Sequence, residues 1–258
     1  MDRLKQLILV IGIAAPLMGA FGFGIKVAMA ADAPSSTLVS VDSANLAPEE
    51  KLSKAKEDLT KALDLSLKKV ESLKTRLNEL NFPPESREQE LKTQALKELD
   101  DYARYYNETK GHLDKATSLD EVKELARQVK EYRDTTYTSG VEKIVKFISV
   151  FYNEEILGVA NDRRDKIEGD IKKLDKFGVI KEGDFRKKLD ETGKLLKEAA
   201  ELQGDAKQMI LSATSTTATT KNKGSSTKEM IEQSFNNVKT VYGIFLELNQ
   251  EVKKALGL

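Results

Sequence analysis

The 258-residue sequence contains no cysteine and no tryptophan, a single histidine and only five prolines. Without cysteine the chain carries no lipid on an N-terminal cysteine and forms no disulfide. The sequence is therefore compatible with an oxidising compartment but does not use one for disulfide bonds. Lys plus Arg number 42, and Asp plus Glu also number 42. This balance excludes the strong field of one sign that is typical of nucleic-acid-binding proteins.

Motifs of several common catalytic classes are also missing. The sequence has no glycine-rich phosphate loop, no Gly-x-Ser-x-Gly elbow and no EF-hand spacing. A dimetal-carboxylate site in a helical bundle needs two Glu-x-x-His pairs, whereas this chain offers only His112, with Glu108 four residues before it. We therefore expect no catalytic residue, no metal site and no cofactor. His112 is interpreted as an exposed residue near a helix end, with a lone ligand or base as the alternative.

Residues 1–30 have the pattern of a secretory signal peptide. Arg3 and Lys5 precede an apolar run over 7–25, and an Ala-Met-Ala triplet ending at Ala30 supplies the small side chains that signal peptidase needs. The chain is therefore expected to be exported, to the periplasm or outside the cell. The alternative is an uncleaved N-terminal membrane anchor, because the apolar run is long enough to cross a bilayer. Glycines within the apolar run favour a cleaved signal peptide over a membrane anchor.

The composition and spacing that follow are those of long helices. One third of the residues are charged, and Leu, Lys, Glu and Ala are abundant, as in coiled coils. After a polar lead-in over 31–46, which we expect to be disordered, apolar residues recur at helical spacing over 47–211 and predict a bundle of about five helices. In the first helix they fall seven apart in two series, interrupted at Ser66. The expected fold is all-α, with long antiparallel helical hairpins forming an elongated bundle with coiled-coil character.

Local signals set the expected helix limits. The helices are predicted at about 48–80, 85–112, from 119 onward, 141–177 and 184–209. The double proline 83–84 must end the first helix, and Ser118 with Glu121 forms a capping-box pattern for the third. Gly178 predicts a left-handed C-terminal cap. The stretch Thr135–Gly140 is rich in Thr, Ser and Gly, so we expect a bend or break there.

A compositional change separates the last helix from the others. Residues 212–226 form a Ser/Thr-rich stretch that we interpret as a solvated linker. Ser226 and Glu229 then form a second capping-box pattern, which opens a C-terminal amphipathic helix over 227–257. Its wide, aromatic apolar stripe is expected to dock either on the rest of the chain or on a partner.

Five tyrosines are the main candidates for ligand contact. Sugars pack on aromatic faces, so Tyr102, Tyr105, Tyr106, Tyr132 and Tyr137 raise a carbohydrate-stacking hypothesis. The favoured interpretation is a structural one, because Tyr102, Tyr106 and Tyr132 fall on the same helical stripes as the leucines. Only Tyr105 falls off the stripe.

Other polar clusters are interpreted as ordinary helix surface. The acidic residues of the fourth helix alternate with Arg and Lys at spacings that favour ion pairs within the helix. These residues are Asp162, Asp165, Glu168 and Asp170, and the pair Glu154 and Glu155 is interpreted likewise. Asn107-Glu108-Thr109 has the form of an N-glycosylation acceptor, which we regard as a chance match.

One segment carries a resemblance to other proteins. Residues 161–178 read NDRRDKIEGDIKKLDKFG and are followed by a second charged helix to Met209. Together, over about 161–210, they resemble the helical hairpins of uncharacterised exported bacterial proteins with coiled-coil character. The resemblance implies a protein of the bacterial cell envelope and transfers no functional residue.

Three functional hypotheses follow. The first is a non-enzymatic scaffold, adaptor or chaperone-like protein of the cell envelope, which binds a protein partner or itself through helix seams. Nucleic acid is not an expected partner, and a membrane is expected only through an uncleaved N-terminal segment. The alternative is a sensor-like bundle that binds a small molecule or glycan at Tyr102–Tyr106. An enzyme built from carboxylates, lysines and tyrosines is the third.

Overall fold

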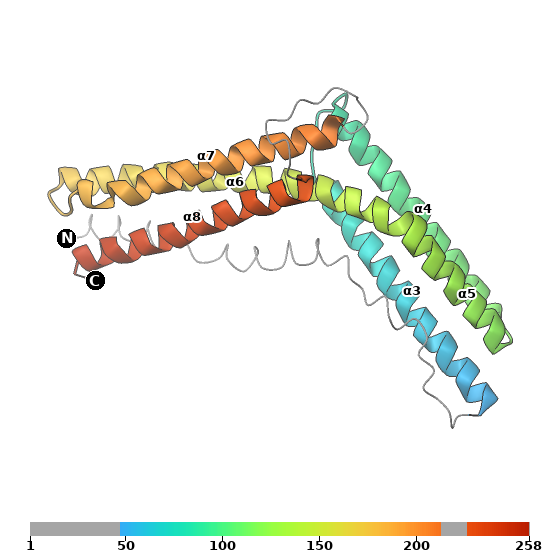
Figure 1. The fold of residues 1–258 in the computed structure, drawn as a ribbon. Helices are drawn as coiled ribbons and strands as arrows, with labels where there is room; N and C mark the ends of the chain where they lie inside the picture. The colour runs from blue at the N-terminus through green and yellow to red at the C-terminus, as the bar shows by residue number, and fades with distance from the viewer. Residues whose placement is uncertain (1–46, 213–225, 258) are drawn as a thin grey trace. The chain divides into compact units, whose positions relative to one another are not determined.

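The computed structural model describes residues 47–212 and 226–257 (Figure 1), and all regular structure within them is helical, which confirms the all-α class. The elements of this part of the chain are α3 (Pro48–Glu79), α4 (Arg87–Lys115), α5 (Leu119–Tyr132), the π-helical turn η1 (Arg133–Tyr137), α6 (Thr138–Lys176), α7 (Gly183–Ser212) and α8 (Thr227–Ala255). The predicted signal peptide (1–30), the lead-in (31–46) and nearly all of the predicted linker lie outside the described residues.

The described chain divides into two compact units, with the boundary between Ile148 and Ser149 inside helix α6. The first unit comprises residues 47–148, and the second comprises 149–212 together with 226–257. Helix α8 belongs to the same unit as α7, so the C-terminal amphipathic helix docks on the rest of the chain, which is one of the two outcomes expected for its apolar stripe.

In the first unit, α3 and α4 run in opposite directions. Lys74 Nζ lies 2.5 Å from Asp100 Oδ1, and Lys110 Nζ lies 2.6 Å from Asp64 Oδ1. Near the connection between the helices, Lys92 Nζ donates to the Leu80 carbonyl at 2.6 Å. Residue numbers in α4 therefore rise as those of their α3 partners fall, which is the signature of an antiparallel pair.

The apolar series read from the sequence of α3 forms its buried face. The fully or nearly fully buried residues of this helix are Ala55, Leu59, Leu63, Val70, Leu73 and Leu77. Pro48 occupies the first turn, where its missing N–H is not needed. The helix ends at Glu79, before the double proline, and α4 starts two residues later than predicted because Ser86 Oγ caps it by accepting from the Gln89 amide at 3.2 Å.

Helix α5 begins where the sequence predicted and then continues through η1 into α6. Ser118 and Glu121 form the expected capping box. Val129 and Tyr137 are both buried and lie eight positions apart, a spacing that keeps two residues on the same face of a helix. The buried stripe continues through this π-helical turn into α6 at Val141 and Ile144.

The chain stays helical throughout Thr135–Gly140, so the prediction of a break there is wrong, and the irregularity of this stretch is the π-helical turn η1. Thr135 donates its hydroxyl to the Glu131 carbonyl at 2.8 Å, which supplies a local partner within the widened turn. The Thr, Ser and Gly content of the segment reflects the wider turn and the close packing of tyrosines described below.

In the second unit, α7 is antiparallel to both α6 and α8. Lys207 Nζ lies 3.0 Å from Glu154 Oε2 of α6, and Lys188 Nζ lies 2.9 Å from Glu247 Oε2 of α8. Helices α7 and α8 pack closely against each other. Small buried residues, including Ala199 and Ala206 of α7, permit that approach.

The buried face of α6 differs from the one predicted beyond Phe151. The apolar spacing Ile148, Phe151, Ile156 predicts Val159 on the buried face, but Val159 is 42% exposed, while Leu157 and Ala160 are buried. The buried face passes through Asn153, which is 2% exposed. Because Asn153 is polar, the apolar pattern does not mark it as part of the buried face. The pattern then favours Val159 over the small Ala160 for that face.

The α6–α7 connection closes as predicted. Gly178 has φ 67°, Val179 N donates to the Leu174 carbonyl at 3.0 Å, and Gly178 N donates to the Asp175 carbonyl at 2.8 Å. These two bonds satisfy the last carbonyls of α6 in the manner of a Schellman motif. The next helix, predicted from 184, begins one residue earlier at Gly183, so Asp184 lies within its first turn rather than capping it.

A buried polar network joins the three helices of the second unit. Asn153 Nδ2 of α6 donates to Gln203 Oε1 of α7 at 2.9 Å and to Ser234 Oγ of α8 at 2.8 Å. Ser234 in turn donates to the Ala199 carbonyl at 2.8 Å, and Gln203 Nε2 donates to the Val150 carbonyl. The three polar side chains are at most 4% exposed. They fix the longitudinal register of the three helices, because any shift would leave buried polar groups without partners.

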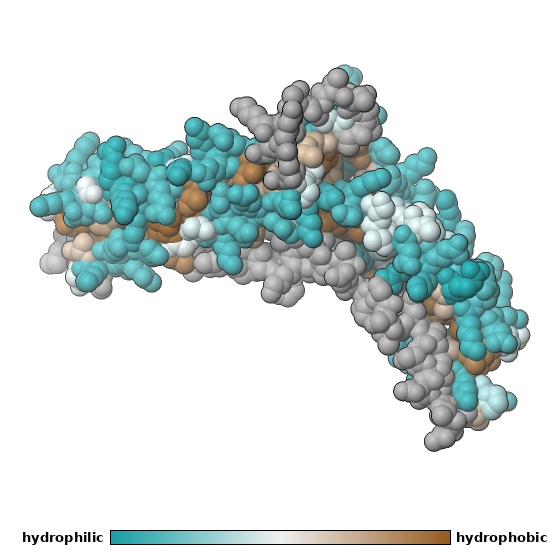
Figure 2. Space-filling view, in the orientation of Figure 1, coloured by the Kyte–Doolittle hydropathy of each residue, from teal (hydrophilic) through white to brown (hydrophobic). Residues whose placement is uncertain are grey.

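The visible surface is mainly hydrophilic, and hydrophobic side chains show chiefly along the seams between helices (Figure 2). None of the helices in the described ranges has both the length and the hydropathy that a bilayer-crossing segment requires.

The buried network yields a stability prediction. Asn153→Leu removes the donor to Gln203 Oε1, so we expect the free energy of unfolding to fall by about 1–3 kcal/mol. The matched control is Asn161→Leu, because Asn161 is exposed and bonds only to the Leu157 carbonyl of its own helix; its effect should stay within about 0.5 kcal/mol. Urea unfolding followed by circular dichroism measures both. Equal effects of the two substitutions would contradict the role assigned to the network.

Candidate functional site

The five tyrosines singled out in the sequence come together in the first unit. Tyr102, Tyr105 and Tyr106 extend from α4, Tyr132 from the end of α5, and Tyr137 from η1. Six ring pairs have centroids between 3.7 and 6.3 Å apart, five of them edge-to-face. We call this group the tyrosine cluster. Edge-to-face aromatic pairs stabilise a fold by more than the burial of their apolar surface area alone.

Tyr106 is the most deeply buried member of the cluster. It is fully buried, and it faces Ser66, the residue that interrupts the leucine series of α3. The small serine leaves room for the ring, and its hydroxyl donates to the Ala62 carbonyl at 3.0 Å. Burial raises the pKa of Tyr106 far above its usual value, an effect that the nearby Ser66 hydroxyl partly opposes.

The cluster keeps its phenols neutral. Burial is the largest cause that raises the pKa of Tyr132 and of Tyr137 to about 12. The hydroxyls of Tyr106 and Tyr137 are buried and have no hydrogen-bond partner of normal geometry among the described residues. Such hydroxyls reduce stability, so the cluster is held by ring packing rather than by hydrogen bonds.

Tyr102 packs against the backbone of Gly140 in the first turn of α6. A Cβ built on Gly140 would lie 1.7 Å from the Tyr102 hydroxyl oxygen and 2.9 Å from Tyr102 Cζ. Any side chain at this position therefore collides with the ring. Gly140 and Ser66 are the residues that the sequence did not identify as parts of the cluster, although each interrupts an apolar stripe opposite a tyrosine.

Tyr105 and Tyr132 form the accessible part of the cluster. Their rings stack with centroids 3.7 Å apart and planes 20° apart, and both side chains are partly exposed. Arg104, whose side chain is 66% exposed, lies beside them and pairs with Asp101 at 2.5 Å. Tyr105 is the tyrosine that the sequence placed off the stripe, and it reaches the surface. The stacked pair therefore offers a rigid aromatic surface next to opposite charges.

The remaining sequence candidates lie apart from the cluster. His112 is exposed in the last turn of α4, which agrees with its structural interpretation. Asp165, Glu168 and Asp170 pair with Arg164, Lys172 and Lys173 at 2.6–3.1 Å, as the interleaved charges predicted. Within the described ranges no group of three or more His, Asp or Glu side chains is arranged to hold a metal ion.

Glu154 and the sequon at Asn107 form ordinary structural contacts. Glu154 pairs with Lys207 across α6 and α7, while Glu155 is exposed. In the sequon at Asn107, the Thr109 hydroxyl is buried and donates to the Tyr105 carbonyl at 2.8 Å. This bond occupies the hydroxyl within the helix, in line with a chance match.

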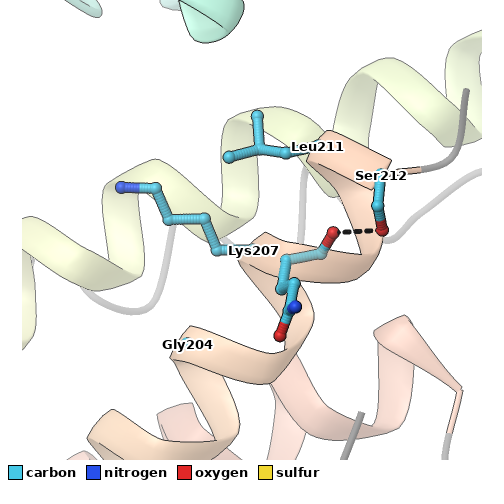
Figure 3. A pocket seen from close by; sticks show the side chains of 5 residues that line it. Gly204, Lys207, Leu211 and Ser212 are labelled. Atoms are coloured by element: carbon cyan, nitrogen blue, oxygen red, sulfur yellow. Dashed lines mark hydrogen bonds between the residues drawn. The ribbon is translucent and has the colours of Figure 1, made fainter. Parts of the chain in front are cut away.

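A shallow depression lies on the last turns of α7 (Figure 3). It is lined by Gly204, Lys207, Gln208, Leu211 and Ser212. All five residues belong to one helix, and the Ser212 hydroxyl donates to the Gln208 carbonyl at 2.5 Å. Lys207 is already engaged, because it pairs with Glu154 and its Nζ lies 5.0 Å from the centre of the Phe151 ring. The depression gathers no set of reactive groups.

No family model, curated protein or solved structure matches the chain. The tyrosine cluster is therefore judged on its geometry alone.

The contact between Tyr102 and Gly140 yields a substitution test. Gly140→Ala should destabilise the protein by about 1–2 kcal/mol, because the collision with Tyr102 outweighs the gain in helix propensity. Gly111→Ala is the control: Gly111 also lies inside a helix and has nothing within 4 Å of its added Cβ, so this change should stabilise by up to about 1 kcal/mol. Adding Tyr102→Phe to Gly140→Ala should recover part of the loss. Denaturant unfolding measures all three, and two alanine variants of equal stability would count against the contact.

The raised pKa values yield a pH dependence. In the unfolded chain tyrosine loses its proton at about pH 10, whereas Tyr132 and Tyr137 in the folded protein have a pKa of about 12. Their contribution to stability is therefore complete below pH 10 and is lost as the pH rises to 12. We expect a smaller loss over this range in Tyr137→Phe than in the unsubstituted protein, measured by urea midpoints. An absorbance titration at which all seven tyrosines ionise near pH 10 would contradict this.

Proposed function

We propose that this chain is an exported, non-enzymatic helical protein that acts through protein–protein contacts in the cell envelope, as a scaffold, adaptor or chaperone-like element. The proposed export rests on the signal-peptide pattern of residues 1–30 and on the resemblance of residues 161–210 to exported bacterial helical proteins. The proposed mode of action rests on the stacked pair Tyr105 and Tyr132, which is the single observation that supports it most directly.

The physical argument concerns rigidity. Tyr and Arg are the residues that contribute most to protein interfaces, since they offer a large contact area together with polar groups. Tyr105 and Tyr132 are stacked on each other, and both contact the buried ring of Tyr106 at 5.6 and 6.1 Å between centroids. A partner that covers this surface therefore restricts few additional side-chain rotations, which lowers the entropic cost of binding.

A second candidate function rests on the same pair. An aromatic surface beside Arg104 and Asp101 also suits a sugar ring, whose apolar face stacks on tyrosine while its hydroxyls bond to charged groups. This is the alternative of a small-molecule or glycan-binding bundle. A thermal-shift screen with glycans distinguishes the two, because a ligand that binds only the folded protein raises its melting temperature.

The protein-contact proposal is tested with a chain that begins at Ala31 and keeps every described residue. Partners are captured by cross-linking in envelope extract, and the affinity of each purified partner is then measured against Tyr105→Ala. We expect a loss of at least about tenfold, as for a central interface residue. Tyr105 is only partly buried, so circular dichroism should show an intact fold.

The matched control is Leu65→Ala. Leu65 belongs to the same unit and is 63% exposed, so it tests whether loss of any exposed apolar side chain weakens binding. The proposal fails if the protein is strictly monomeric and retains no partner, or if the two alanine variants lose affinity equally.

A further inference from the structure

The turn between α6 and α7 presents the most exposed large hydrophobic side chain in the described part of the protein. Phe177 is 74% exposed. It directly follows α6 and precedes Gly178, whose positive φ turns the chain back. Val179 and Ile180 then pack against the core of the second unit. Because these two residues supply the apolar contact of the helix cap, Phe177 is not needed for it and stays outside.

Four basic residues lie at the same end of the second unit as Phe177. Lys176 precedes it and Lys181 follows four positions later, and neither forms an ion pair with another described residue. The last turn of α8 adds Lys253 and Lys254. Figure 1 shows this turn at the same end of the unit as the α6–α7 connection. We call Phe177 with these four lysines the basic tip.

Two acidic groups of the turn form local contacts, and Asp184, in the first turn of α7, is exposed. Asp175 Oδ1 accepts from the Glu182 amide at 3.2 Å and so stabilises the turn. Glu182 lies within reach of Arg186, at 3.7 Å. Two helical ends with their partial negative charge also meet here, and the lysines offset that charge. The four lysines outnumber the nearby carboxylates of Asp175 and Asp184, so a net positive charge remains beside the exposed aromatic ring.

We propose that the basic tip docks on a bilayer surface that contains anionic lipid headgroups. An aromatic side chain inserts at the boundary between headgroups and acyl chains, while lysines remain at the level of the phosphates. Charge complementarity selects this occupant over a second copy of the chain, because two basic tips repel each other. One phenyl ring and four lysines provide reversible attachment, comparable with a single acyl chain. The proposal adds a membrane contact to the N-terminal one considered from the sequence, and it does not depend on Tyr105.

The absence of tryptophan from the chain allows a local test. Phe177→Trp introduces a single tryptophan at the tip, and Leu65→Trp introduces one at a comparably exposed position in the other unit. Both are made in the chain that begins at Ala31, so that the N-terminal apolar run does not bind vesicles. Each protein is mixed with vesicles of phosphatidylcholine alone or with 30% phosphatidylglycerol, and tryptophan emission is recorded.

The expected result is a blue shift for Phe177→Trp with anionic vesicles only, which high salt reverses, and no shift for Leu65→Trp. In flotation assays, Phe177→Ala should weaken binding about tenfold and Lys176→Glu with Lys181→Glu at least tenfold. Equal shifts at the two positions, no shift at the tip, or binding that is insensitive to the lysine reversals would overturn the proposal. So would a blue shift without vesicles that grows with protein concentration, since that indicates self-association.

Discussion

Each helix of this protein can bury only a narrow stripe, and the structure depends on how the interruptions of that stripe are filled. Where leucines recur without interruption, as over much of α3, packing gives stability but many registers are nearly equivalent. The interruptions remove this ambiguity. Ser66 receives Tyr106, Gly140 receives Tyr102, and Asn153 bonds to Gln203 and Ser234. A shift of one helix along another would leave a ring without space or a polar group without a partner.

The same arrangement connects stability with the proposed activity. The tyrosine cluster excludes water from its inner rings and leaves two buried hydroxyls without normal hydrogen bonds, so it carries an energetic penalty. The buried ring of Tyr106 in turn supports the outer members, Tyr105 and Tyr132, in a fixed position. In the second unit the buried polar network holds the helices in register, and the exposed Phe177 lies in a turn fixed by Gly178. In both units, a well-determined interior holds a distinctive side chain at the surface.

Most helices could be predicted from the sequence because their signals are local. The capping boxes at Ser118 and Ser226, the double proline and Gly178 all act within a few residues. The tyrosines were recognised, and their assignment to helical stripes was sound for Tyr102 and Tyr106. What the sequence did not indicate depends on distant partners: the burial of Asn153 and the roles of Gly140 and Ser66 each require a residue from another helix. A grouping into units requires the same knowledge, and a single sequence does not supply it.

The distribution of aromatic residues makes one unit optically distinct. Tryptophan is absent, and five of the seven tyrosines belong to the cluster, while Tyr152 and Tyr242 lie in the second unit. Ring pairs held at fixed angles couple their electronic transitions, so near-ultraviolet dichroism of the whole protein arises mainly from residues 102–137. Far-ultraviolet dichroism instead counts helical residues of both units. Comparing the two signals during unfolding therefore reveals whether the units lose structure together or in sequence.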